Sequence, residues 1–570
     1  MNNPGFDSSV RTHPFGPFPS MNVFPVKERR DVSPREASIQ GFERALLVAA
    51  LSVSSILFAS CTAKNLSRRV DRTANRVLYE RTKDTLGARE ETVVWPEEVE
   101  ETDAEESGEG ERATPEERVE AVSLARALSL GVTSNRDYLA QEENLFLAAL
   151  SLAETRHAFT PLLSSALGFI FDGDGLPEDR RTSFSAGVDM ILPWGGSVSL
   201  NGSSSLSDLN NSPGADSSNF NSNLSLQLVQ PLLRGAGAEE SHEALTAAER
   251  NMVYSIRDFE LFREDFSIDV ARRYYDLVQQ AQSIDNERRN MEELTFAEQQ
   301  AQALFDVGRT RELDVLRARR NRLNADNRLI EALENYEAAT DRFRIFLGLP
   351  TNVRVEIIKG APEFVPVTYD VESAVEVALL NRLDLINRRE QLEDFERAVR
   401  ISKNDLLPDL DFNASVNAPA GPNSSFSNQN FDNESLSLGL SLEIPVDRVN
   451  ESSSYRRAQI RLTQAQRSFE EFQDNLIVTV ESAFRELERR KLSLEIQRQL
   501  IQDEQKNVRV AQLRFERGEI PNRDVVEAQQ SLLDARNSLI REQVNYEIAR
   551  LGLLRDLGIV FIDEQGMWIE

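Results

Sequence analysis

Cysteine and histidine are scarce in this chain, which has one Cys and three His among 570 residues. A single cysteine excludes an intramolecular disulfide and a thiolate metal cluster. His13, His157 and His242 are scattered, with no partner cysteine and no spacing typical of metal ligands. The chain also lacks a P-loop, a dinucleotide-binding glycine pattern and a nucleophile elbow. We therefore expect no enzyme activity, metal site or cofactor, and we expect packing or interface roles for His157 and His242.

Clustered basic residues are also missing. The formal net charge is -29, and a phosphate-binding surface would need Lys and Arg gathered on one face, so nucleic acid is excluded as a partner. Much of the acid lies in one block, residues 97–117, which combines low hydrophobicity with heavy negative charge. Such a block is typical of a disordered linker or solvated arm. The alternative is a tail that binds a specific partner.

Glycine and proline are absent from five long stretches. The longest two have about 70 residues each, which at about 1.5 Å per residue would make helices of about 105 Å. Helices of that length need neighbours, so a coiled-coil or tubular packing is expected. The stretches are 238–307, 309–347, 371–407, 446–517 and 522–551.

The chain contains an internal duplication. Residues 301–350 repeat as residues 511–560, at a constant offset of 210 positions and without a gap. A duplicated helical hairpin of this kind predicts pseudo-symmetry in the fold. Identical pairs include Phe305 and Phe515, Gly308 and Gly518, Asp314 and Asp524, Asn327 and Asn537, Glu337 and Glu547, and Gly348 and Gly558.

The same order of elements is predicted in both copies: a medium helix, a β segment, a very long helix, a glycine-centred turn and a second medium helix. The first medium helix is expected over 115–159 in one copy and over 371–407 in the other. Together the two medium helices of a copy match the length of the long one. We therefore expect two shorter helices stacked end to end beside one continuous helix.

Cys61 directly follows an apolar run, residues 45–59, that is too short to span a membrane comfortably. The run and the cysteine resemble a bacterial lipoprotein signal, in which the cysteine becomes the acylated first residue of the mature protein. Phe58 stands where Leu is usual, and the long segment ahead of the run is consistent with translation from Met21. Thr62, rather than Asp, after the cysteine favours the outer membrane. The alternative is a buried free cysteine.

Two segments rich in Ser, Asn and Gly alternate apolar and polar residues, as strands with two different faces do. A half-buried soluble sheet would give the same pattern, but beside a lipid anchor it suits a membrane β-barrel. In the first segment Leu224, Leu226 and Leu228 alternate with Ser225 and Gln227, and in the second Leu436, Leu438, Leu440 and Leu442 alternate with Ser437, Gly439 and Ser441.

Prolines bracket both β segments, which run over 161–231 and 408–445. The first is 33 residues longer, which is enough for one additional hairpin with a tight turn at residues 192–196. Trp194 would then lie in the aromatic belt of a barrel. The alternative is a long, partly ordered loop with Trp194 packed against it.

Taken together, these features resemble the TolC-type outer-membrane efflux proteins, over residues 115–560. The most specific are the two hairpin tips, in which a glycine permits the positive φ of a sharp helix-to-helix reversal. The residues that carry the resemblance are Phe305 to Thr310 followed by Leu313 to Ala318, Phe515 to Glu519 followed by Asp524 to Ala528, Tyr274-Tyr275-Asp276, and Pro231 to Gly235.

The resemblance implies a mostly helical fold with β-strands, in which two repeats of long antiparallel helices form an α-barrel. In that family three protomers share one membrane β-barrel, with four strands from each, and the helical tips meet a periplasmic adaptor and, through it, an inner-membrane pump. It therefore implies a homotrimer in the outer membrane, in contact with its lipid, with the helical barrel in the periplasm. The additional hairpin leaves open whether each protomer has four or six strands.

Residues near the tips are the candidate functional residues. Asp524 and Glu527 share a helix face, and the resemblance aligns them with paired acids that ring the periplasmic entrance. Three copies would gather six carboxylates, which would favour cations and raise some carboxylate pKa values by like-charge repulsion. The alternative is a solvated helix face with Asp524 hydrogen-bonded locally.

The turns themselves are the predicted contacts with the adaptor, and the alternative is that their two glycines serve the turn alone. The predicted adaptor residues are Val307, Gly308, Arg309 and Thr310 of the first tip and Arg517, Gly518, Glu519 and Ile520 of the second.

The predicted function is the exit duct of a tripartite efflux pump or type I secretion system. A periplasmic coiled-coil scaffold without channel activity is the alternative, and the barrel-like alternation in both copies argues against it. None of these features specifies the exported substrate, the pump or the adaptor.

The predicted organisation is a leader over 1–60, an acidic flexible arm over 61–114 that starts at lipidated Cys61, a first efflux repeat over 115–350, a linker over 351–370, a second efflux repeat over 371–560 and a tail over 561–570.

Overall fold

The structure is a computed structural model, which describes residues 63–87, 119–172, 179–209, 217–360, 362, 364–367, 370–419 and 434–569. The chain divides into two compact units, Met1–Arg69 and Val70–Glu570. Of the first unit only residues 63–69 are described, and they form the start of helix α2 (Ala63–Leu86). All the other described elements belong to the second unit. No helix in these residues is long and apolar enough to cross a membrane.

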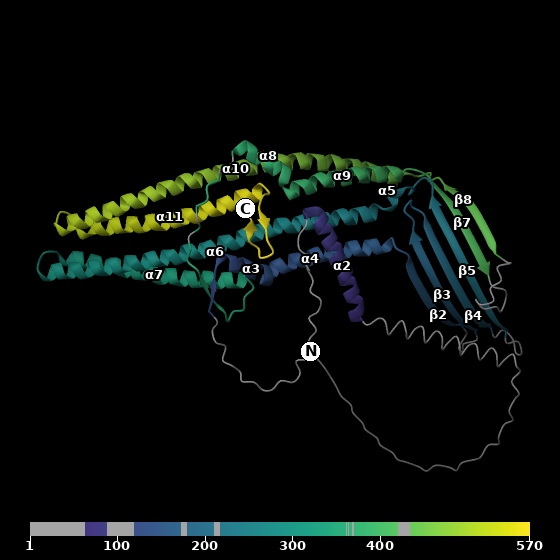
Figure 1. Cartoon of the computed structure of the whole chain (residues 1–570), viewed down its shortest axis with the longest axis horizontal. Coiled ribbons are helices and arrows are strands. Elements are labelled where there is room, and N and C mark those ends of the chain that lie inside the picture. Colours follow the sequence, from purple (N-terminus) through teal and green to yellow (C-terminus); the bar gives the residue numbers. More distant parts are fainter. Residues whose placement is uncertain are drawn as a thin grey trace, which may run out of the picture. The chain divides into compact units, whose positions relative to one another are not determined.

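Two long helices dominate the second unit (Figure 1). α6 (Glu243–Asp306) has 64 residues and α10 (Val449–Glu516) has 68, and each reverses into a helix of 35 residues, α7 (Glu312–Phe346) or α11 (Asn522–Asp556). Packing against neighbouring helices stabilises helices of this length, because α6 lies along α7 and α11, and α10 lies along α11. The long helices predicted over 238–307 and 446–517 are confirmed, although each begins a few residues later, after a separate short helix α5 (Ala238–Ser241) in the first copy.

The prediction of one continuous medium helix ahead of each β segment is wrong. The first copy breaks at Asn135, whose backbone is extended and whose Oδ1 accepts a hydrogen bond from Tyr138 N at 2.8 Å. Such a cap starts a new helix and competes with continuation of the old one. Arg382 is extended at the corresponding place in the second copy. The described elements are β1 (Val119–Val122), α3 (Leu124–Ser134) and α4 (Arg136–Ala158) in the first copy, and α8 (Val371–Asn381) and α9 (Leu383–Asn404) in the second.

Each of these breaks meets the Leu-Gly turn that ends the second medium helix of the same copy. Gly348 has φ +76°, and a Cβ there would overlap the backbone carbonyl of Ser134. Gly558 has φ +67° and lies against the backbone of Asn381. The same contact therefore recurs in both copies, which confirms the pseudo-symmetry that the duplication predicts.

Gly348→Ala is expected to lower the free energy of unfolding by about 2–4 kcal/mol, because Ala resists positive φ and its Cβ would displace the Ser134 carbonyl. Gly552→Ala is the matched control. Gly552 lies inside α11 with open space where a Cβ would be, so the change should be neutral or stabilising by about 0.5–1 kcal/mol. Thermal denaturation followed by circular dichroism compares the two variants, and equal midpoints would contradict this account of the turn.

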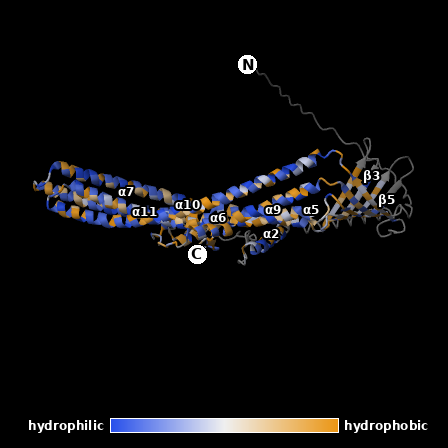
Figure 2. Ribbon diagram, turned by 90° about the horizontal axis from the view of Figure 1, so that it is seen from above, coloured by the Kyte–Doolittle hydropathy of each residue, from blue (hydrophilic) through white to orange (hydrophobic). Residues whose placement is uncertain are grey.

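The largest hydrophobic core surrounds the middle of α6, where apolar residues gather in Figure 2. Tyr138 packs on Phe266 with ring centroids 5.1 Å apart. β1 pairs in parallel with β6 (Arg354–Ile357) beside this core. A C-terminal hairpin of β9 (Phe561–Ile562) and β10 (Trp568–Ile569) covers it, and Ser267 Oγ donates to Gly566 O at 2.8 Å. Segments predicted as a linker and a tail thus contain strands that close the core.

The start of the predicted flexible arm is helical, which corrects that prediction. Ala74, Val77 and Leu78 of α2 have the spacing of one helix face, and all three are buried against α4 and α6. The prediction rested on the acidic half of the arm and overlooked this apolar stripe. Residues 88–114 of the arm, Cys61 and the leader lie outside the described residues.

The strands of the two predicted β segments form one antiparallel sheet of six, in the order β2-β3-β4-β5-β7-β8. The additional hairpin is therefore present, and the alternative of a long loop is wrong. Its turn is where the sequence predicts it: Leu192 N donates to Gly196 O at 2.7 Å, and Gly195 has φ +96°. Trp194 is exposed in this turn. The strands are β2 (Leu162–Asp172), β3 (Asp179–Ile191), β4 (Ser197–Leu209), β5 (Ser217–Pro231), β7 (Asp409–Pro419) and β8 (Ser435–Glu443).

Glu264 of α6 is a buried carboxyl group with charged neighbours. Its side chain is largely removed from water, and its Oε2 accepts no hydrogen bond within the described residues. Burial raises the pKa of Glu264 from its usual value of 4.5 to about 8, the nearby charge of Glu260 adds to the rise, and Arg382 opposes it. The group is therefore largely neutral in the folded protein at pH 7.

This raised pKa predicts a stability that falls with pH. The folded chain keeps a proton that the unfolded chain loses, so stability from Glu264 is fully present below pH 4.5 and is lost as the pH rises through about 8. We expect Glu264→Gln to raise the unfolding midpoint at about pH 8 and to change it little at about pH 4. Glu293→Gln, at an exposed position of the same helix, is the control. If both variants showed the same pH dependence of the unfolding midpoint, the raised pKa of Glu264 would not be its cause.

Candidate functional site

Both long helices end in the same glycine turn, at the end of the second unit opposite the sheet (Figure 1). Gly308 and Gly518 both have φ +74°. In each turn two backbone N–H groups bond back to carbonyls of the preceding helix, which is the Schellman motif. The bonds are Gly308 N to Phe305 O at 2.8 Å and Arg309 N to Leu304 O at 2.8 Å, then Gly518 N to Phe515 O at 2.8 Å and Glu519 N to Arg514 O at 2.9 Å.

The eight residues predicted to contact the adaptor lie at these two tips. Six are exposed, and Val307 is the most open apolar one at 67%. Thr310 and Ile520 are half-buried: Thr310 Oγ1 donates to Asp314 Oδ2 at 3.3 Å, and Ile520 packs on the small core of the second tip. These two residues therefore help to hold the tips together as well as presenting a surface.

Two apolar residues next to the first tip were absent from the predicted set. Leu313 and Leu316, in the first turn of α7, are 52% and 54% exposed. Their signal in the sequence is a pair of leucines three positions apart immediately after a glycine turn, a spacing that puts both on one helix face. With Val307 they extend the exposed apolar surface of this tip.

Asp524 and Glu527 lie in the first two turns of α11, which confirms that they share a helix face. Glu527 is exposed, and Asp524 is half-buried with Arg523 Nε at 3.4 Å from its Oδ1. At the equivalent place in the first tip Asp314 faces Arg317, with 3.6 Å between Oδ1 and Nη1. The equivalent positions thus hold two acids at the second tip and an acid with a base at the first, and the acidic ring at the entrance stays a prediction.

The two hairpins lie side by side through α6 and α11. Asn286 Nδ2 donates to Asn537 Oδ1 at 2.7 Å, and Arg328 Nη2 donates to Gln530 Oε1 at 3.4 Å. These contacts bring the predicted adaptor residues of both tips and the acidic pair to one end of the helical part. Polar side chains thus contribute to the links between the two hairpins.

One face of the sheet is polar across all six strands. The strand register places mainly small polar residues and glycine side by side in the middle rows of this face, and Leu162, Ile191 and Val229 lie on the same face at the end nearest the helices. Lined up by hydrogen-bonded neighbours, one row reads Ser164, Gly187, Asn201, Ser225, Asn417 and Ser435.

The opposite face is apolar across the same six strands. Its side chains are uncovered at the last strand, where the four leucines of β8 are 59–68% exposed. A two-faced sheet of this kind suits lipid on one side and water on the other. The neighbouring row reads Leu163, Val188, Leu200, Leu226, Val416 and Leu436.

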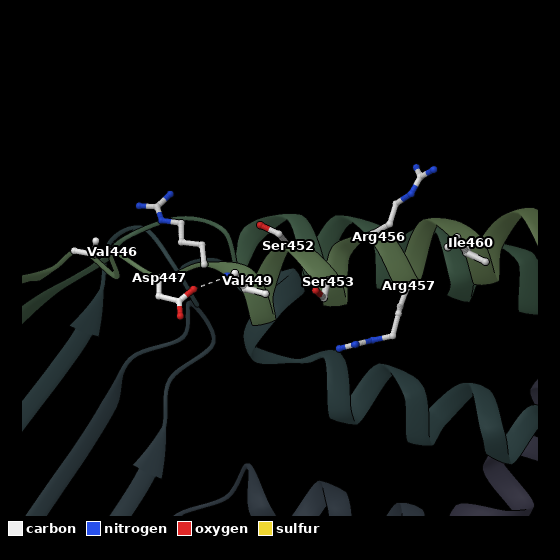
Figure 3. A pocket seen from close by; sticks show the side chains of 9 residues that line it. Val446, Asp447, Val449, Ser452, Ser453, Arg456, Arg457 and Ile460 are labelled. Carbon is white, nitrogen blue, oxygen red and sulfur yellow. Dashed lines mark hydrogen bonds between the residues drawn. The ribbon is translucent and has the colours of Figure 1, made fainter.

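A shallow depression lies where β8 passes into α10 (Figure 3). Val446 precedes the helix and is 99% exposed, and Val449 and Ile460 are exposed along the first turns of α10. Arg456 and Arg457 point to different sides of the helix in Figure 3. Exposed apolar side chains therefore lie on both sides of the junction between β8 and α10, among polar and charged ones.

Histidine and acidic side chains form no metal site in the part of the chain that the structure describes. His242 stacks on Phe159, with ring centroids 5.1 Å apart, and its Nδ1 lies 2.9 Å from Ser241 Oγ. His157 Nδ1 lies 3.1 Å from Thr160 Oγ1. His242 thus has a packing role beside the first β segment, as expected from the sequence, whereas His157 is exposed and contacts Thr160. His13 lies outside the described residues.

Duplicated helical hairpins joined to one two-faced sheet define the fold of the TolC-type outer-membrane channels. This chain belongs to the outer membrane efflux protein family, whose model matches residues 195–349 and 374–558. Membership makes it an efflux channel of the outer membrane with its helices in the periplasm. The match begins at Gly195, so β2 and β3 precede it.

Solved outer-membrane channels share the fold, and no curated protein matches the sequence. VceC from Vibrio cholerae has a TM-score of 0.57 at 14% identity, with 76% of this chain and 96% of that chain covered. CmeC from Campylobacter jejuni has 0.55 at 15%, with 76% and 85% covered. MtrE from Neisseria gonorrhoeae has 0.54 at 13%, with 76% and 89% covered.

Proposed function

We propose that three copies of this protein form the passive exit duct of a tripartite efflux pump or of a type I secretion system. The observation that carries the proposal is the sheet with one apolar and one polar face, joined directly to long helical hairpins. Closing such sheets into a barrel leaves no strand edge unpaired in lipid and places the polar face around a water-filled passage. A helix of 64 residues, about 96 Å long, would carry that passage deep into the periplasm.

The hairpin tips would meet a periplasmic adaptor and, through it, an inner-membrane pump. Exposed Val307 and Leu313 at the first tip and exposed Arg517 and Glu519 at the second support this role, because none of them belongs to the cores of the helical part. A photo-crosslinking residue placed at Val307 or Arg517 should capture an adaptor identified by mass spectrometry. Capture of this chain alone would contradict the assignment.

Cys61 would carry the lipid that anchors the chain in the outer membrane. The apolar run and the small residues ahead of the cysteine support this role. Metabolic labelling with palmitate is expected to mark the wild-type chain and to fail with Cys61→Ala. Label that persists in the variant would contradict acylation at this position.

Membrane fractionation tests the duct against the scaffold alternative. A duct is expected to appear in the outer membrane, to resist carbonate extraction and to migrate as a trimer in mild detergent. The decisive form of the experiment uses Cys61→Ala, because without a lipid a scaffold would pass into the aqueous phase, whereas a barrel would stay in the membrane.

A further inference from the structure

The two edge strands of the sheet are built for pairing with another strand. Each of them, β2 and β8, has one neighbour among the described strands. Edge strands normally carry charges, prolines or bulges that prevent further pairing. Residues 162–171 of β2 and 435–442 of β8 contain no charged residue and no proline. The edges thus lack the usual protection over 10 of the 11 residues of β2 and 8 of the 9 residues of β8.

A second copy of this chain is the partner that fits both edges. All neighbouring strands are antiparallel and their number is even, so β2 and β8 run in opposite directions. When β8 of one copy lies beside β2 of the next, the pair is therefore antiparallel too. The apolar and polar faces of the sheet would also continue from one copy to the next. The leucines of β8 lie on the same face as Leu163 of β2, and the serines of β8 lie on the same face as Ser164.

The surface beside the free edge of β8 points to the same partner. Ile444, Val446 and Val449 are 57%, 99% and 68% exposed, and they line the path from β8 into α10 beside the depression of Figure 3. Exposed apolar side chains on both sides of the junction between an open edge strand and its helix match a neighbour with the same strand-to-helix layout. A copy of this chain has that layout.

We infer that three copies close these edges into one barrel of eighteen strands; the number of copies rests on the proposed function. A barrel with four strands from each copy would have twelve. With strands about 4.8 Å apart and tilted by about 40°, eighteen strands enclose a backbone circle of about 36 Å and twelve enclose one of about 24 Å. The cross-section at the outer membrane is thus about twice as large. The strand end of such a barrel is a wide aperture.

Cysteine pairs across the edges test the closure. All substituted positions lie on the polar face: Ser164→Cys or Ala166→Cys on β2 is combined with Ser437→Cys or Ser441→Cys on β8. We expect at least one combination to give covalent trimers on a denaturing gel after mild oxidation. Ser183→Cys with Ser437→Cys is the control, because β3 lies inside the sheet between β2 and β4. The wild type, with Cys61 as its one cysteine, gives the background.

Top-view averages of the detergent-purified trimer by electron microscopy measure the barrel directly. We expect a backbone diameter of about 36 Å, and about 24 Å in a variant that lacks residues 175–214, in which β2 leads directly to β5. Stable trimers with a diameter of about 24 Å in the wild type and no crosslinks between β2 and β8 would overturn the inference and leave the proposed duct standing. A chain that forms no trimer and stays out of the membrane would overturn both.

Discussion

The double variant Asp524→Asn/Glu527→Gln is expected to lose the cation preference of the channel in a planar bilayer. Both residues lie on one face at the start of α11, and Glu527 is exposed. We propose that in a trimer they contribute six carboxylates to one constriction, where a ring of like charges would concentrate cations. Charged clefts raise local counter-ion concentration by about tenfold or more, so the preference for K⁺ over Cl⁻ should fall by about that factor.

A charge-matched control separates this ring from a general change in protein charge. Glu372→Gln/Glu376→Gln removes the same two charges per chain from exposed positions of α8, far from the tips along the second unit (Figure 1). The control should keep the wild-type selectivity and conductance. If the two variants had the same ion selectivity, the result would be consistent with a duct and would contradict the acidic ring.

Glu547→Gln is expected to lower the free energy of unfolding by about 3 kcal/mol. Glu547 and Arg550 are both buried in α11, and they form a bidentate pair with distances of 2.8 Å and 3.0 Å. An amide cannot supply the negative charge that Glu547 gives to this ion pair, and breaking a buried ion pair by removing one partner is costly. Chemical denaturation of the detergent-solubilised protein, followed by circular dichroism, measures the change.

The duplication supplies the control for this variant. Glu337 is the same residue at the equivalent position of the first copy, and it is exposed. Glu337→Gln should therefore change the free energy of unfolding by no more than about 0.5 kcal/mol. If the two variants were destabilised equally, burial of the pair in the second copy would not be the cause.

The long helices and their tips could be predicted from the sequence because their determinants are local. A stretch free of Gly and Pro between 446 and 517 continues as one helix, and Gly518 supplies the positive φ that the reversal needs. The alternation of apolar and polar residues likewise predicted two-faced strands, and the length of the first β segment allowed the additional hairpin.

The predictions from the sequence that were wrong or incomplete concern features that depend on residues distant in the chain. The break at Asn135 has no Gly or Pro to mark it, and a capping side chain together with contact to the Gly348 turn produces it. β1 and β6 pair across more than 200 residues of sequence, and neither reads as a strand on its own. Helix α2 packs against α4 and α6, and Ala74 and Val77 are buried in the apolar cluster that the three helices share. Tertiary contacts, rather than local preference, decide each of these cases.

The acidic pair shows where prediction from one chain ends. Helix periodicity placed Asp524 and Glu527 on one face, and the structure confirms this. Their effect on ions depends on how three copies bring that face to a common axis, which belongs to the assembly. The equivalent pair of the first copy, Asp314 and Arg317, is neutralised within the chain, so the acidic ring is expected from the second copy alone.

Single-channel recording of the purified wild-type protein in a planar lipid bilayer tests whether this chain forms a channel. A trimeric duct is expected to insert and to produce discrete, uniform conductance steps from a preparation whose helix content and trimeric state have been verified. A known outer-membrane channel, recorded under the same conditions, serves as the positive control. If that control inserts repeatedly and this protein produces no steps, the result would contradict a channel and favour the scaffold.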